Sequence, residues 1–111
     1  MNVREVNLEE NMPSCDEAME TLKAMVSLSK KNRDRCLIVI HGYGSTGRGG
    51  KIREKARQWL NAQVRKGTVK AVVYGEDFNV FSPKAVELKN RYRELAPLMS
   101  VVNDGVTVVE L

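Results

Sequence analysis

Apolar residues recur along this chain with two spacings, one typical of β-strands and the other of α-helices. Short apolar segments rich in β-branched residues predict four strands, at residues 3–8, 36–40, 69–74 and 106–111. Apolar residues three or four positions apart predict three helices with one buried face each, at residues 14–29, 51–66 and 83–95. Strands alternating with helices predict an α/β fold, a two-layer sandwich of helices on a mixed four-stranded sheet.

Local signals mark the ends of the predicted helices. Ser14 and Glu17 have the spacing of a capping box, in which each side chain accepts a hydrogen bond from the other residue's backbone N–H. Gly67 is well placed to end the second helix. Pro83 after a serine is typical of a helix start, and the third helix should stop before Pro97.

The predicted strands differ in how well the sequence places them. Strand 36–40 is apolar throughout, as expected of a central strand that is buried on both faces. It should lie parallel to strand 3–8, because a helix connects the two. Val101 and Val102 could pair across the turn at 103–105 as a small hairpin. The position of the last strand in the sheet stays open.

The length and the cysteine content narrow the class of protein. The chain has 111 residues, which suits one domain spanning residues 1–111. No apolar run approaches the roughly 20 residues that span a bilayer, and the first residues lack the apolar segment of a secretory signal. Cys15 and Cys36 are too few for a disulfide framework, so the sequence predicts reduced thiols in a cytoplasmic protein.

The formal net charge of +4 conceals an uneven distribution. Residues 30–70 hold 12 basic and 2 acidic side chains, whereas residues 1–29 and 71–111 are both net acidic. A segment this basic attracts polyanions if its charges share one face. The alternative is that these lysines and arginines are ordinary solvated helix surface.

The basic segment contains a glycine-rich loop. Residues 42–50 include five glycines, which allow positive φ angles and a close approach of the backbone to a ligand. Since the loop follows a buried strand and opens a helix, its backbone N–H groups should face a single crevice that suits an anion. Positive charge is added there by Arg48, Lys51, Arg53, Lys55 and Arg57.

Two nucleotide-binding motifs match this loop only in part. A Walker A loop aligned on Gly50-Lys51 would place Ile52 where a magnesium-binding hydroxyl belongs. The dinucleotide spacing G-x-G-x-x-G is present from Gly42 to Gly47, but no acidic residue near positions 62–67 could hold a ribose. Both nucleotide functions are therefore disfavoured.

Three motifs follow one another instead: His41-Gly42-x-Gly44 ends a strand, Thr46-Gly47 follows, and Ile52-Arg53 opens a helix. Residues 105–111 add a closing G-x-T-x-V-x-L strand. With these motifs the chain resembles the small MutS-related (Smr) domain, from about residue 3 to residue 111. The resemblance implies the fold of the C-terminal domain of translation initiation factor three, binding of DNA or RNA and, in several members, metal-stimulated endonuclease activity. Residues 78–98 would be a helical insertion.

The first strand departs from the family pattern. The family usually reads Leu-Asp-Leu-His-Gly there, whereas this chain has Asn7 in place of the acid and Glu9 in place of the histidine. An amide cannot act as a general base, and the near-neutral pKa of an imidazole is lost at the second position. Glu9 or Glu10 could still hold Mg²⁺ or Mn²⁺ through oxygen. The resemblance therefore supports nucleic-acid binding better than it supports cleavage.

The loop and the resemblance together give a set of candidate site residues. The residues expected to bind nucleic acid or its phosphates are His41, Gly42, Gly44, Thr46, Gly47, Arg48, Lys51 and Arg53. If the protein cleaves its ligand, the catalytic residues would be His41, Glu9 and Arg53, with His41 as acid or base and Arg53 on the scissile phosphate. His41 is the single histidine and cannot form a zinc site alone.

Three hypotheses follow from these residues. The leading one is an Smr-like domain that grips the phosphate backbone largely without reading sequence. The second is a hydrolase, a metal-dependent endonuclease acting on DNA or RNA. The third is a non-catalytic protein-interaction module that has lost the nuclease residues. The sequence leaves open the choice between DNA and RNA, and the oligomeric state.

Overall fold

We examined the protein in a computed structural model that describes residues 2–42 and 48–111, with only the backbone of residues 48 and 49. The helices and strands follow one another in the order β1 (Val3–Asn7), α1 (Cys15–Lys31), β2 (Cys36–Ile40), α2 (Arg48–Lys66), β3 (Ala71–Tyr74), η1 (Gly75–Asp77), α3 (Pro83–Arg91), η2 (Arg93–Ser100) and β4 (Val106–Glu110). All four predicted strands and all three predicted helices are present within one or two residues, except at the start of α2 and the end of α3.

The four strands form one mixed sheet in the order β1-β2-β4-β3. β1 lies parallel to β2, as the connecting helix predicts, with Val3 opposite Cys36. β4 enters between β2 and β3 and is antiparallel to both. The last strand, which the sequence could not place, is therefore central: all five of its residues are buried.

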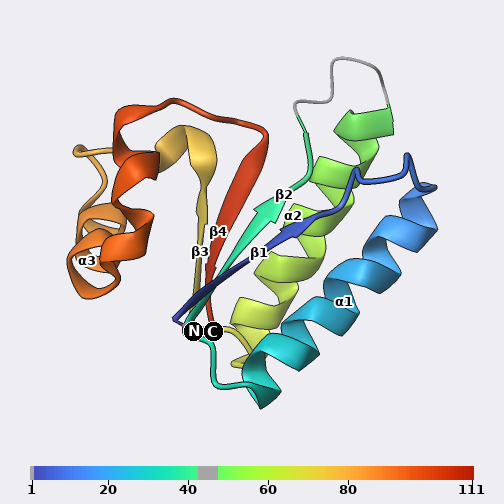
Figure 1. The fold of residues 1–111 in the computed structure, drawn as a ribbon, viewed down its shortest axis with the longest axis horizontal. Coiled ribbons are helices and arrows are strands. Elements are labelled where there is room, and N and C mark those ends of the chain that lie inside the picture. Colours follow the sequence, from blue (N-terminus) through green and yellow to red (C-terminus); the bar gives the residue numbers. More distant parts are fainter. Residues whose placement is uncertain (1, 43–47) are drawn as a thin grey trace.

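α1 and α2 cover one face of the sheet (Figure 1). The capping box at Ser14 is present: its hydroxyl accepts the Glu17 N–H at 3.1 Å, and the Glu17 carboxylate accepts the Ser14 N–H at 2.9 Å. Leu22, Leu37 and Leu60 are fully buried in the core that these helices share with the sheet. Gly67 ends α2 with a φ of +80°, as predicted.

α3 and η2 cover the other face of the sheet (Figure 1). Phe78, Leu88 and Leu95 pack there on Ile38 in a second core. Glu110 of β4 anchors this layer: its carboxylate accepts hydrogen bonds from Arg91 at 2.6 Å and from the Tyr92 hydroxyl at 3.2 Å. The fold class is as predicted, but the expected two layers become three, because residues 78–98 lie on the sheet.

Two sequence predictions near this layer are wrong. The third helix does not continue to residue 95: α3 ends at Arg91, and the chain goes on as a tighter 3₁₀ stretch that contains Pro97. Val101 and Val102 form no hairpin strand; they are exposed, and β4 pairs with β2 and β3 instead. β4 finds longer and more apolar partners in those strands than a two-residue strand could offer.

The elements give the molecule two distinct ends (Figure 1). At the loop end, β1 and β2 finish and α1 and α2 begin. At the base, α1 and α2 finish near both ends of the chain. We define the base by residues 30–35, residues 65–70 and Leu111. No helix within residues 2–42 and 48–111 combines the length and the apolar character that a membrane span requires.

Candidate functional site

His41 and Gly42 connect β2 to the loop end and are tied there to β4. Both of their backbone N–H groups donate to the carbonyl of Gly105, at 2.9 and 3.0 Å. Gly42 has a φ of +82°, a conformation that L-residues with a side chain rarely adopt. A Cβ at this position would overlap the carboxylate of Glu9. The positive φ favours glycine here, and the carboxylate of the exposed Glu9 side chain lies directly on the start of the loop.

The His41 side chain is fully buried beneath this turn. Its Nδ1 lies 3.0 Å from the carbonyl of Gly42, which can only accept, so Nδ1 carries the proton. Its Nε2 therefore accepts from the hydroxyl of Thr107, at 2.8 Å. That hydroxyl in turn accepts the Nε–H of Arg57, at 2.9 Å. A continuous chain of hydrogen bonds thus runs from Arg57 through Thr107 and His41 to the loop backbone.

This environment keeps His41 neutral. Burial lowers its pKa to about 4, and the positive charges of Arg57 and Arg53 act in the same direction, against the opposing effect of the hydrogen bond with Gly42. At neutral pH both ring nitrogens are already engaged with protein atoms. The geometry favours a role for His41 in orienting the loop backbone and Thr107.

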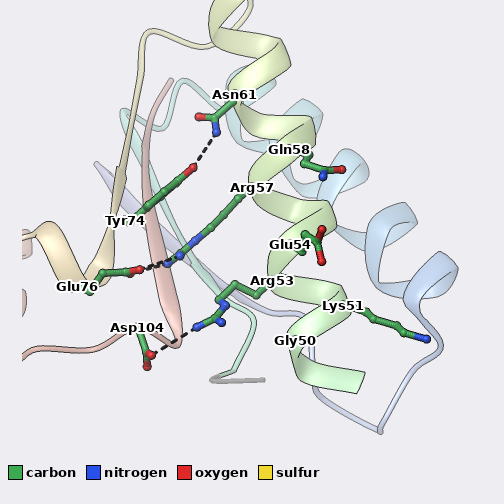
Figure 2. Close-up of a pocket in the computed structure, with 10 residues that line it drawn as sticks. All are labelled: Gly50, Lys51, Arg53, Glu54, Arg57, Gln58, Asn61, Tyr74, Glu76 and Asp104. Atoms are coloured by element: carbon green, nitrogen blue, oxygen red, sulfur yellow. Dashed lines mark hydrogen bonds and ion pairs between the residues drawn. The ribbon is translucent and has the colours of Figure 1, made fainter. Parts of the chain in front are cut away.

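A groove opens beside this network along the first turns of α2, with a volume of about 820 Å³ (Figure 2). β3, η1 and the turn before β4 form its other wall. The groove is lined by Gly50, Lys51, Arg53, Glu54, Arg57, Gln58, Asn61, Tyr74, Glu76 and Asp104. Three of these side chains are basic and three are acidic, so the lining is close to electrically neutral.

Two arginines of the groove are held very differently (Figure 2). Arg57 donates to both carboxylate oxygens of Glu76, at 2.9 and 2.7 Å, and its guanidinium lies 4.0 Å from the centre of the Tyr74 ring. Although burial acts to raise the pKa of Glu76, the hydrogen bonds and charge of Arg57 lower it overall. Among the described residues, Arg53 has one polar contact, 3.4 Å from Asp104. Arg57 is thus part of the framework, whereas Arg53 can exchange its partner.

The remaining candidate residues lie in the turn after β1 or in the glycine-rich loop. Asn7 Oδ1 accepts the backbone N–H of Glu9 at 2.9 Å, so the amide that replaces the family's acid shapes the turn after β1. Glu10 is exposed in that turn. The candidates Gly44, Thr46 and Gly47 lie outside the described residues, as does the side chain of Arg48.

The donor set can be compared with what Mg²⁺ or Mn²⁺ requires. Within the described parts of the chain, no three His, Cys, Asp or Glu side chains come close enough to hold a metal ion together. Magnesium demands near-octahedral oxygen coordination and is usually held by one or two carboxylates together with substrate phosphates. Glu9 and Glu10 do not build a protein metal site by themselves.

Comparison with known proteins agrees with this geometry. The family model of the Smr domain matches residues 11–77. The chain belongs to the Smr domain family. The crystal structure of the Smr domain of Thermus thermophilus MutS2 superposes on this Smr domain with a TM-score of 0.60 at 20% identity, over 97% of this chain and 96% of that one. At that identity the likeness concerns the fold. No curated protein matches the sequence significantly.

Sequence reasoning predicted part of this Smr domain's site and missed another part. Because β1 and β2 are parallel neighbours, Glu9 and Gly42 meet, a contact that the sequence left open. The hydrogen-bonded framework of Arg57, Glu76 and Thr107 was missed. Arg57 was expected only to add positive charge around the loop, and it lies four residues after Arg53 on the same face of α2. The other two come from separate elements, and nothing in their sequence neighbourhood marks them.

Proposed function

We propose that this Smr domain binds the phosphate backbone of nucleic acid at the loop end. The observation that carries the proposal is the position of Arg53, which reaches into an open groove beside the Gly42 turn with one long ion pair. A phosphate can replace Asp104 as its partner, because a guanidinium offers two parallel N–H donors to phosphate oxygens. Lys51 lines the same groove and is exposed.

The start of α2 strengthens this assignment. Its first turn contains no acidic residue, so no side chain of that turn offsets the positive end of the helix dipole. Contacts of this kind fix a strand by its backbone and carry no base readout. We therefore expect affinity for many sequences, with a strong dependence on salt.

The test compares two charge-matched double variants. Lys51→Ala/Arg53→Ala removes two cations from the groove, and Lys89→Ala/Arg93→Ala removes two from the α3 layer on the other sheet face. Fluorescence anisotropy with labelled 20-bp duplexes of DNA and RNA gives the slope of log affinity against log salt. We expect the groove variant to have a shallower slope, smaller in magnitude by about 1.8 at about 0.9 per lost phosphate contact, and the control to keep the slope of the wild type.

Equal slopes for the two variants and the wild type would overturn the assignment of the groove. Absence of any binding to either duplex would favour the protein-interaction alternative. The ratio of absorbance at 260 and 280 nm of the purified protein gives a first indication, since a nucleic-acid binder retains ligand from the cell. Gly44, Thr46, Gly47 and Arg48 remain predicted contacts.

Endonuclease activity is the second candidate function, and the position of Glu9 favours it. Its carboxylate lies on Gly42, at the edge where a bound phosphate would enter. Against it stand the neutral, buried imidazole of His41 and the amide of Asn7. Nicking of supercoiled plasmid with Mg²⁺ or Mn²⁺ decides: activity that Glu9→Gln abolishes would establish cleavage, and activity that survives both Glu9→Gln and His41→Ala would come from a contaminant.

A further inference from the structure

The basic segment of residues 30–70 does not gather on one face. Five of its twelve cations lie in the loop end or the first turns of α2, about the groove. The other seven lie at the base, at the ends of α1 and α2 and in the connections that follow them: Lys30, Lys31, Arg33, Arg35, Arg65, Lys66 and Lys70. Lys30 donates to the carbonyl of Thr68, so the cations that follow α1 lie close to those that follow α2.

A small cavity of about 230 Å³ opens within this basal group, which is large enough for a phosphate. It is lined by Arg33, Asp34, Arg35, Lys70, Tyr92 and Leu111. The three cations are exposed, and among the described residues none of them forms an ion pair with a carboxylate. Asp34 is engaged by Arg4. The side chains that line the cavity therefore hold three cations against one carboxylate, which Arg4 already engages.

The backbone at Arg33 supplies an independent observation. Arg33 has a φ of +61° at the position where helices commonly end in glycine. The N–H of Asp34 donates to the carbonyl of Ser29 at 2.9 Å, which completes this type of helix end. Glycine would adopt the conformation without steric conflict, whereas arginine is strained there. Strained residues of this kind cluster where the side chain has a function, and here the side chain is a wall of the cavity.

We propose that Arg33, Arg35 and Lys70 form a second phosphate site, which binds the same nucleic-acid backbone as the loop end; this rests on the proposed function. From Arg53 to Lys66, the last residue of α2, the helix advances 13 residues. At about 1.5 Å per residue this spans about 20 Å, or about six base pairs of a duplex at about 3.4 Å each. One duplex along α2 can reach both.

A membrane surface is a less suitable ligand for the basal cations. Insertion into a membrane needs several exposed apolar side chains beside the cations, and among the described residues Leu28 is the one exposed large hydrophobic side chain in the last turn of α1.

The test uses untagged protein, because Leu111 lines the cavity. Arg33→Gln/Arg35→Gln/Lys70→Gln removes the basal cations, and Lys23→Gln/Lys89→Gln/Arg93→Gln is a charge-matched control away from both sites. Binding of a labelled 20-bp duplex is measured across a range of salt. We expect the basal variant to lower the slope by about 2–3 at about 0.9 per contact, and the control to leave it unchanged. Arg33→Gly, which relieves the backbone, serves if the triple variant does not fold.

The outcomes separate this proposal from the proposed function. An unchanged slope for the basal variant, with a lowered slope for Lys51→Ala/Arg53→Ala, overturns the basal site alone. The reverse result supports the basal site and overturns the groove. An equal fall for the control variant overturns the basal site, since net charge would then explain the binding. Binding to phosphatidylserine vesicles is measured with the same variant. If the basal substitutions weaken vesicle binding as much as duplex binding, nucleic acid is overturned as the specific ligand of the basal site.

Discussion

The loop end and the base of this Smr domain both carry positive side chains, but they use them differently. At the loop end, three cations share one groove with three acidic residues, and Arg57 is fixed by Glu76, Tyr74 and Thr107. At the base, the cations that line the cavity have no carboxylate partner among the described residues. At the loop end one of the three cations thus builds the site, whereas at the base no cation that lines the cavity has such a role. A count of charges along the chain cannot make this distinction.

The two ends also differ in how they use a positive φ angle. Gly42 at the loop end and Gly67 at the base have nearly the same φ, +82° and +80°. The carboxylate of the exposed Glu9 side chain lies over Gly42, whereas an added Cβ at Gly67 would meet nothing within 4 Å. The same backbone conformation thus places the chain against a candidate site residue at one end and is a simple helix end at the other.

The first expected effect concerns Gly42→Ala. The substitution imposes the strain of the left-handed conformation and adds a methyl group that displaces the carboxylate of the exposed Glu9 side chain. We expect the free energy of unfolding, measured by urea denaturation, to fall by about 2 kcal/mol. Gly67→Ala is the matched control and should cost about 1 kcal/mol, because it adds backbone strain alone. Equal losses would mean that the Glu9 side chain moves aside without cost.

A second effect tests the buried histidine of the loop end. The pKa of His41 is lowered to about 4, so between pH 6.5 and pH 4 the unfolded chain binds a proton that the folded protein does not. Stability should therefore fall as the pH drops through this window, by up to about 3 kcal/mol at about 1.4 kcal/mol per pKa unit. Urea unfolding at pH 7, 6, 5 and 4 measures it. In His41→Gln this contribution to the slope should vanish; an unchanged slope would assign the loss to carboxylates.

The contrast between the two groove arginines gives a third effect. Arg57→Gln leaves Glu76 without its partner and interrupts the chain of hydrogen bonds to His41. We expect it to lower the free energy of unfolding by about 2 kcal/mol. Arg53→Gln should change stability by less than about 0.5 kcal/mol, since its one ion pair is long and partly exposed, while weakening duplex binding. Thermal unfolding and anisotropy on both variants would reveal whether the roles are reversed.

How far the sequence could predict this molecule depends on how local each cause is. The capping box, the apolar strand β2 and the parallel pairing of β1 with β2 follow from short motifs and one helical connection. The central position of β4 does not, because its partners lie far along the chain. The third layer was missed for a related reason: Glu110 looks like a solvated strand end, yet it is buried under α3.

The smallest expected effect has opposite signs for stability and binding. Arg33→Gly replaces a residue strained at a φ of +61° by one that adopts this conformation freely, so the free energy of unfolding should rise by about 0.5–1 kcal/mol. The same change removes a guanidinium from the basal cavity and should weaken duplex binding. Arg33→Asn separates the two causes, because asparagine tolerates the conformation but carries no charge. A stabilised protein with undiminished affinity would mean that the strain at Arg33 serves no binding function.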